Sequence, residues 1–148
     1  MGSSGRGADR YGTVDLDESV RMRYYISGPM TGYVGDNRAK FARVTATLRA
    51  QGHQVVDPTE MDMVYNAAGD IDGKTPSPLW RMFIARDVAI ILSSQFERVM
   101  ALRGWQRSRG ARMEIMAAVM CGTEVVDEEG NQLVVTAIDL VDLLPKGV

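Results

Sequence analysis

Cysteine and histidine each occur once in these 148 residues, as Cys121 and His53. A single cysteine cannot form an intramolecular disulfide, and Cys121 follows an apolar helical stretch, so we expect a buried and unreactive thiol. His53 has no neighbours at the spacing of metal ligands, so we expect no metal site. The chain also lacks a G-x-G-x-x-G pattern and a Walker lysine, which disfavours dinucleotide and nucleoside triphosphate cofactors. We therefore expect no cofactor.

Long apolar runs and a large excess of one charge are missing too. No run reaches the roughly 18 residues of a membrane span and no signal peptide is visible, so we expect a cytoplasmic protein without a membrane partner. The net charge is −2, whereas domains that hold the backbone of DNA or RNA are normally basic. This balance argues against a nucleic acid polymer as partner, but it leaves room for one small anion.

Apolar periodicity and turn residues predict alternating strands and helices. The expected strands are 23–27, 54–56, 98–102 and 124–126, and the expected helices are 37–51, 77–92, 111–120 and 137–144. Asp36 is the expected N-cap of the first helix. A long loop over 58–75 separates the second strand from the second helix. Its length is typical of a lid or binding loop, although a plain insertion explains it equally well.

This alternation predicts a three-layer α/β domain of the Rossmann or flavodoxin type. We expect a mainly parallel sheet of four to five strands with helices on both faces. Residues 21–148 form this single domain. Residues 1–20 are rich in Gly, Ser, Asp and Arg without an apolar period, and we expect them to be a disordered arm.

Two strand ends carry the sequence signals of a binding site. In parallel α/β sheets, ligands bind beyond the carboxyl ends of the strands. The first strand runs into Ser27-Gly28-Pro29-Met30-Thr31-Gly32, a turn in which backbone N–H groups can approach a ligand. The third strand runs into 103–110, which leads to a helix N-terminus suited to an anion. Glu114 follows early in that helix, and Asp87 lies in the apolar half of the helix before it.

The sequence resembles the nucleoside 2-deoxyribosyltransferase superfamily, in particular phage-type relatives and nucleoside 5′-monophosphate N-glycosidases. The resemblance covers about residues 23–126. Its pieces are Tyr25-Ile26-Ser27-Gly28-Pro29-Met30-Thr31-Gly32, Asn37 with Phe41, Leu48-x-x-x-Gly52, Val55-x-x-Pro58, Trp80-x-x-x-x-x-x-Asp87 and Leu102-x-Gly104-Trp105-x-x-Ser108-x-Gly110-Ala111-x-x-Glu114. The family's hydrolases carry serine and arginine where this chain has Pro29 and Thr31.

The resemblance implies a role for each matching position. Glu114 takes the place of the nucleophile that attacks the anomeric carbon and forms a glycosyl ester. Asp87 matches the acidic residue that helps protonate or hold the departing base, and Tyr25 matches the tyrosine that orients the nucleophile. The substrate-binding positions implied are Ser27, Gly28, Pro29, Met30, Thr31, Ser108, Arg109 and Gly110.

Ser108 bears on the choice of substrate. The resemblance implies aspartate at this position in transferases of free nucleosides and serine in monophosphate hydrolases. A physical reason supports the contrast, because aspartate repels a phosphate dianion whereas a hydroxyl and helix N–H groups attract it.

We therefore expect an N-glycosidase of a nucleoside or deoxynucleoside 5′-monophosphate, which works through a covalent intermediate on Glu114. The alternatives are a nucleoside 2-deoxyribosyltransferase that exchanges bases on free deoxynucleosides, and a non-catalytic protein that sequesters a nucleotide. We also expect a homo-oligomer, because the family assembles so and the Met-rich segment 113–120 offers an apolar face.

Overall fold

The computed structural model describes residues 21–30, 37–62, 78–93 and 95–136. Its strands are β1 (Arg23–Ser27), β2 (Gln54–Val56), β3 (Arg98–Ala101) and β4 (Glu124–Val126). Its helices are α2 (Arg38–Ala50), α3 (Pro58–Asp62), α4 (Pro78–Ser93) and α5 (Arg109–Met120), with the short 3₁₀ turn η2 (Trp105–Arg107) before α5.

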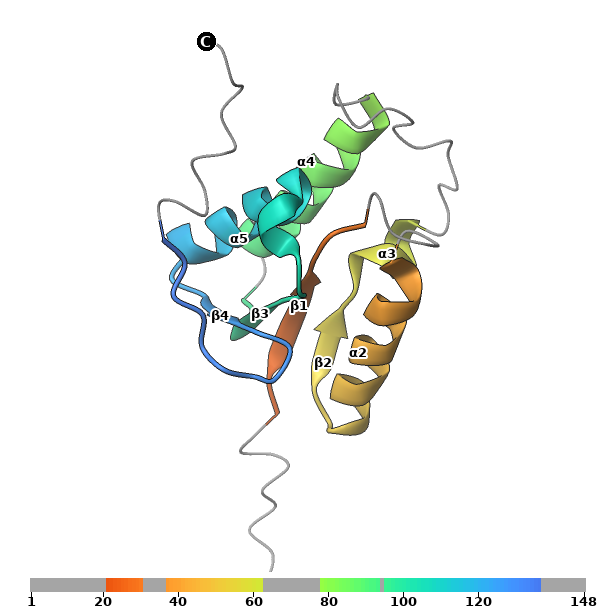
Figure 1. The fold of residues 1–148 in the computed structure, drawn as a ribbon, viewed down its shortest axis with the longest axis vertical. Coiled ribbons are helices and arrows are strands. Elements are labelled where there is room, and N and C mark those ends of the chain that lie inside the picture. The colour runs from red at the N-terminus through yellow and green to blue at the C-terminus, as the bar shows by residue number, and fades with distance from the viewer. Residues whose placement is uncertain (1–20, 31–36, 63–77, 94, 137–148) are drawn as a thin grey trace, which may run out of the picture.

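Within the described residues, the strands form one parallel sheet in the order β2-β1-β3-β4 (Figure 1). The predicted α/β class with a parallel sheet and flanking helices is confirmed. The chain passes from β1 to β2 on one side and returns to β3 on the other, so the strand order reverses between β1 and β3. In parallel α/β sheets, such a reversal opens a crevice at the carboxyl ends of the two strands.

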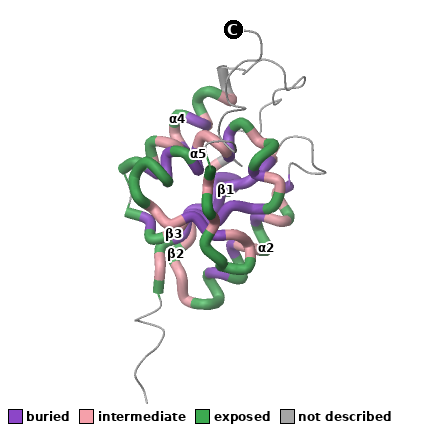
Figure 2. The backbone as a smooth tube through the Cα atoms, turned by 60° about the vertical axis from the view of Figure 1, so that its left-hand side comes forward, coloured by how far each residue is buried: buried purple, intermediate pink, exposed green. Residues whose placement is uncertain are grey.

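The two faces of the sheet carry different helices. Side chains of successive strand residues point to opposite faces, and Tyr25, Val99 and Val125 accordingly pack with the α5 residues Ala111, Ile115 and Ala118. Tyr24, Ile26 and Met100 pack on the other face with Phe41 and Leu48 of α2. Both faces are therefore covered, and Figure 2 shows the buried strands in the middle with the exposed backbone mainly on the helices.

The ends of β1 and β3 approach each other closely at Gly28. The N–H group of Leu102 donates to the Ser27 carbonyl at 2.8 Å, which continues the pairing past the end of β3. A Cβ atom on residue 28 would lie 2.7 Å from the Leu102 Cβ. Any side chain at Gly28 would therefore force the two strand ends apart.

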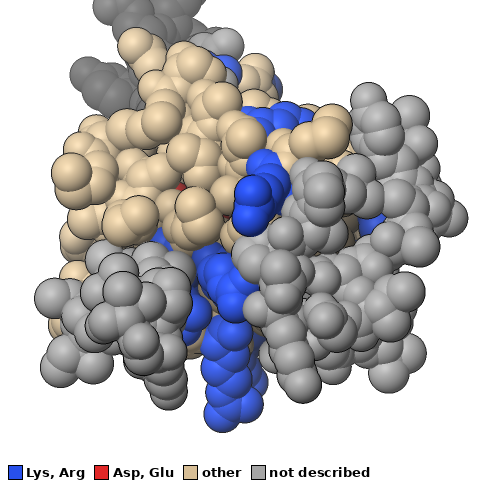
Figure 3. Space-filling model, turned by 90° about the horizontal axis from the view of Figure 1, so that it is seen from above, with Lys and Arg blue, Asp and Glu red and all other residues tan. Residues whose placement is uncertain are grey.

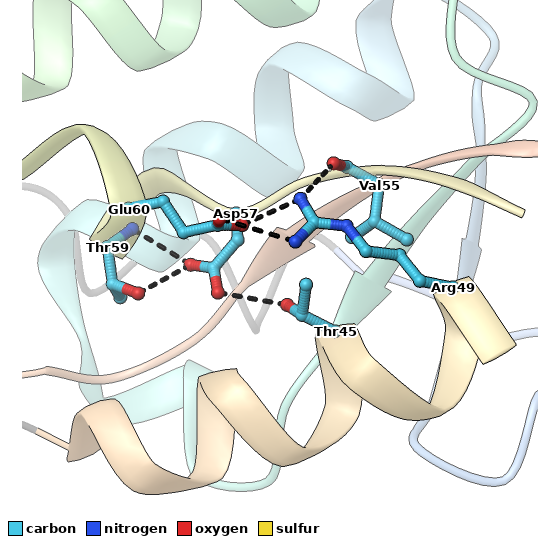
Figure 4. A network of polar contacts seen from close by, with 6 residues as sticks. All are labelled: Thr45, Arg49, Val55, Asp57, Thr59 and Glu60. Carbon is cyan, nitrogen blue, oxygen red and sulfur yellow. Dashed lines mark hydrogen bonds and ion pairs between the residues drawn. The ribbon is translucent and has the colours of Figure 1, made fainter.

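A buried carboxylate at the end of β2 joins three elements (Figure 4). Asp57 accepts hydrogen bonds from the Thr45 hydroxyl of α2 at 2.9 Å, from the Thr59 N–H at 2.9 Å and from the Thr59 hydroxyl at 2.7 Å. The Arg49–Glu60 ion pair at 2.7 Å lies beside it and is half exposed. Asp57 thus starts α3 and fixes α2 to the carboxyl edge of the sheet.

Three local predictions were wrong. Residues 58–62 form helix α3 rather than loop, because Asp57 satisfies the first N–H groups and proline is favoured at a helix start. The cap of α2 is Asn37 in the left-handed conformation, with φ 60°; Asp36 itself lies outside the described residues. Asn37 instead donates its side-chain N–H to the Pro29 carbonyl at 2.8 Å. Cys121 is exposed, because it is the C-cap of α5 and lies at the exposed end of that helix.

Several predictions fall outside the described residues: the arm 1–20, Thr31, most of the loop over 58–75 and the helix 137–144. The remaining element boundaries agree with the expected ones to within two residues at each end. No helix in the described ranges is long and apolar enough to cross a membrane.

Candidate functional site

Tyr25, Asp87 and Glu114 come together between β1, α4 and α5. Tyr25 is in the middle of β1 and is fully buried, while Asp87 of α4 and Glu114 of α5 are 5% and 6% exposed. The charges of both carboxylates act on the Tyr25 hydroxyl, which places the three groups in one neighbourhood. Two buried carboxylates and a phenol so close together are costly for folding, and such clusters concentrate at functional sites.

Tyr25 keeps its proton in this environment. Burial raises the pKa of Tyr25 well above its ordinary value, the charges of Glu114 and Asp87 raise it further, and the Arg86 guanidinium lowers it. The hydroxyl makes no hydrogen bond of standard geometry with the described residues, although the Glu114 carboxylate lies near enough to act as an acceptor. A protonated phenol is a hydrogen-bond donor, and Glu114 is a candidate acceptor for it.

Arg86 belongs to the same neighbourhood, and the sequence analysis missed it. Its Nη2 and Nε atoms both lie 2.7 Å from Oδ1 of Asp87, and its guanidinium lies over the Phe83 ring at 5.2 Å. The only signal in the sequence was a charged pair, Arg86-Asp87, inside an apolar helix. A next-neighbour pair on a helix is rarely in contact, so the sequence did not indicate this ion pair.

The segment before Glu114 forms the N-terminus of α5. Ser108 is the N-cap, and its Oγ accepts a hydrogen bond from the Ala111 N–H at 3.2 Å. Because this bond uses the oxygen as acceptor, the hydroxyl proton can still be donated to a ligand. Arg109 begins the helix, with its guanidinium 5.9 Å from the Trp80 ring centroid. Gly110 is buried, and a Cβ there would lie 2.8 Å from Cδ1 of Ile84.

Only some residues of the loop after β1 lie near Tyr25 and the N-terminus of α5. The Ser27 hydroxyl is buried and donates to the Ala111 carbonyl at 3.5 Å, which joins the end of β1 to the first turn of α5. Gly28 and Pro29 are buried, and the Pro29 carbonyl is occupied by Asn37. Met30 packs instead against the core on the α2 side. The structure therefore brings Ser27 to the group of Tyr25 but turns Met30 away from it.

The carboxyl edge of the sheet has a basic surface. Strands point upward in Figure 1, and Figure 3 shows this edge from above. Lys and Arg side chains are exposed on it, whereas the described acidic residues show only as a small recessed spot. The segment from β3 to α5 contributes exposed arginines at 107 and 109, and its third exposed arginine, Arg103, is ion-paired with Glu129. A protein with a net charge of −2 thus presents positive charge on the described part of this edge.

A separate cleft lies further along the same edge. It has a volume of about 230 Å³ and is lined by Gly104, Trp105, Asp127 and Leu133 among others, but by none of Tyr25, Asp87 and Glu114. In the parts of the chain that the structure describes, no three His, Cys, Asp or Glu side chains gather so that they could hold a metal ion.

Comparison with known proteins identifies one family. The model of a family described as a domain of unknown function, DUF4406, matches residues 22–127, which include every element from β1 to β4. No curated protein matches the chain. No solved structure matches it either.

The raised pKa of Tyr25 predicts a loss of stability at alkaline pH. A folded-state pKa above that of the unfolded chain means that the contribution of Tyr25 is complete below about pH 10 and declines as the pH rises beyond it. We expect the free energy of unfolding of the wild type, relative to Tyr25→Phe, to be smaller at about pH 11 than at about pH 8. Urea denaturation at several pH values measures it, since the other tyrosines cancel in the comparison. A constant difference would contradict the assignment.

Proposed function

We propose that this chain, which belongs to the DUF4406 family, binds a nucleoside 5′-monophosphate and cleaves its N-glycosidic bond. One observation supports this above all: two buried carboxylates and a protonated tyrosine meet beside the N-terminus of α5, where the strand order reverses. The resemblance of the motifs to nucleoside 2-deoxyribosyltransferases and monophosphate N-glycosidases supports the same chemistry.

Glu114 is the nucleophile in this proposal. Its carboxylate forms a bond to the anomeric carbon as the bond from that carbon to the base nitrogen breaks, and the base leaves with a proton. Water then hydrolyses the glycosyl ester and restores the carboxylate. Tyr25 donates towards Glu114 and keeps it in the orientation for attack. Burial between β1 and α5 strengthens these interactions, because little water screens them.

The phosphate is bound at the start of α5. The helix N-terminus, the Ser108 hydroxyl and the exposed Arg107 and Arg109 all favour a dianion there. No acidic residue occurs between Arg103 and Met113. A free nucleoside would leave this positive charge unused, which is why the proposal prefers a monophosphate.

Replacing the Glu114 carboxylate by an amide tests the chemistry. We expect Glu114→Gln to lower the rate of base release on the order of 10³-fold or more, because an amide is a very poor nucleophile, while binding of the monophosphate changes little. Chromatography of the free base measures turnover and calorimetry measures binding. Glu129→Gln, at an exposed carboxylate, is the matched control. Wild-type turnover by Glu114→Gln would refute the nucleophile.

The same assay separates the alternatives. Base exchange that requires a second base, without hydrolysis, would identify a transferase. Tight binding of nucleotides without release of any base from nucleosides or monophosphates would identify a sequestering protein.

Two substitutions of Ser108 test the phosphate site. Asparagine and aspartate both cap helices as serine does, so we expect little change in stability from either. Ser108→Asp places a negative charge beside the phosphate and costs about 2–4 kcal/mol, so the preference for monophosphate over nucleoside falls about 30- to 1000-fold. Ser108→Asn, which is neutral, keeps most of the preference. An equal preference in wild type and Ser108→Asp would exclude this site.

We also propose that the chain self-associates. Helix α4 exposes an apolar stripe at helical spacing, made of Met82, Ala85, Ala89 and Leu92, and α5 exposes Met116, Val119 and Met120. A contiguous exposed apolar patch often marks an interaction surface. Apart from these two groups, the exposed large apolar side chains of the described residues consist of Val134 alone.

Light scattering at micromolar concentration is expected to show a dimer or a larger homo-oligomer. Ala85→Glu places a charge in the centre of the α4 stripe and is expected to shift the protein towards monomer. Ala46→Glu, at an exposed alanine of α2 on the other side of the sheet, is the control and should leave the assembly intact. A monomeric wild type would end this proposal without affecting the glycosidase.

A further inference from the structure

The Arg86 side chain has an unusual conformation on α4. Consecutive helix residues point about 100° apart and do not normally face each other. Two nitrogens of the Arg86 guanidinium nevertheless contact one oxygen of the next residue, Asp87 Oδ1, each at 2.7 Å. The guanidinium also lies over the ring of Phe83, 5.2 Å from its centre. The side chain therefore lies along the helix between these two neighbours instead of extending into solvent, and it is only 25% exposed.

The groups around Asp87 give this arrangement a chemical consequence. Tyr25 from β1 and Glu114 from α5 lie in the same neighbourhood, and the positive charge of Arg86 acts there as well. A second carboxylate nearby disfavours the ionised form of Asp87, whereas a guanidinium in contact favours it. The contact with Arg86 therefore offsets the repulsion from Glu114 and favours an ionised Asp87.

We propose that Arg86 is a positioning residue that keeps Asp87 ionised and fixed in orientation beside Tyr25 and Glu114. This inference rests on the proposed function and resolves a choice within it. The aspartate at this position either protonates the departing base or holds it, and an ionised Asp87 can only accept hydrogen bonds. Asp87 then binds the N–H groups of the base.

The remaining proton balance involves water. The base leaves with a proton from a water molecule, and the hydroxide equivalent resolves the ester on Glu114, so that one water is consumed for each bond cleaved. The substrates that fit are nucleotides whose base presents an N–H donor to Asp87.

The first experiment does not depend on turnover. The protein is labelled with ¹³C at the aspartate carboxyl carbons, the Asp87 signal is assigned by its loss in Asp87→Asn, and its titration is followed by NMR. We expect Asp87 to take up its proton at a higher pH in Arg86→Met than in wild type, with Arg86→Lys between them. Arg81→Met, at an exposed arginine of the same helix, should match the wild type. An unchanged Asp87 titration in Arg86→Met would overturn the proposal.

The second experiment measures base release from monophosphates. We expect Arg86→Met to lower kcat/KM about 10- to 100-fold, and the acid limb of its pH profile to move together with the Asp87 titration. Arg86→Lys should recover part of the loss. Should Arg86→Met fail to fold, Arg86→Lys carries the test alone, since it keeps the charge but loses the two-nitrogen contact.

The two experiments separate the two proposals. If the wild type releases no base but the Asp87 titration shifts in Arg86→Met, the glycosidase is refuted. The proposal that Arg86 keeps Asp87 ionised is then still supported. Base release that is unaffected in Arg86→Met despite a shifted titration would refute the role of ionised Asp87 in the reaction.

Discussion

The parallel pairing of β1 with β3 positions the part of the candidate site that the sheet provides. Tyr25 is paired with Val99 and Ser27 with Ala101, and both face the α5 side of the sheet. The pairing continues past the end of β3 because Gly28 leaves room for Leu102. If the two strand ends were wider apart, the N-terminus of α5 could not contact Ser27, and Glu114 would lose its position beside Tyr25.

Charge burial is the second constraint, and the molecule meets it in two ways. Asp57 has hydrogen-bond donors for both oxygens, from Thr45 of α2 and Thr59 of α3. Asp87 has a guanidinium in contact but also two acidic neighbours in Tyr25 and Glu114. Opposing charges around a buried carboxylate are more typical of functional sites than a shell of hydroxyl and backbone donors. In the proposed function, this difference separates Asp57, which joins elements of the fold, from Asp87, which binds the substrate.

Much of the fold could be predicted from local patterns. Alternating apolar residues, Gly and Pro at strand ends and helical periodicity located four strands and three helices of the described chain. Helix α3 was missed, because a single turn capped by Asp57 has no period to detect. The exposure of Cys121 was missed for another reason: an apolar stretch does not tell which side of a helix faces the sheet, and α5 leaves Met116 and Met120 exposed too.

Sequence reasoning could select a candidate residue where its chemical type and its position both suggested a site. Glu114 is the example, a carboxylate early in a helix that follows a glycine-containing turn. Arg86 was not predictable, since its contact depends on the path of a long flexible side chain. Met30 packs on the α2 side of the sheet, and sequence could not predict this either. Its placement depends on long-range contacts, because Asn37 holds the carbonyl group of the preceding residue, Pro29.

Ser108 and Glu114 are carried by one continuous helix, the former as its cap and the latter in its second turn. Six residues of helix span about 9 Å, and this length does not vary with loop conformation or solvent. The helix therefore fixes the distance between these two backbone positions, and a substitution at either one leaves it unchanged. In the proposed function, the lengths and directions of the two side chains then set which substrate atoms each of them contacts.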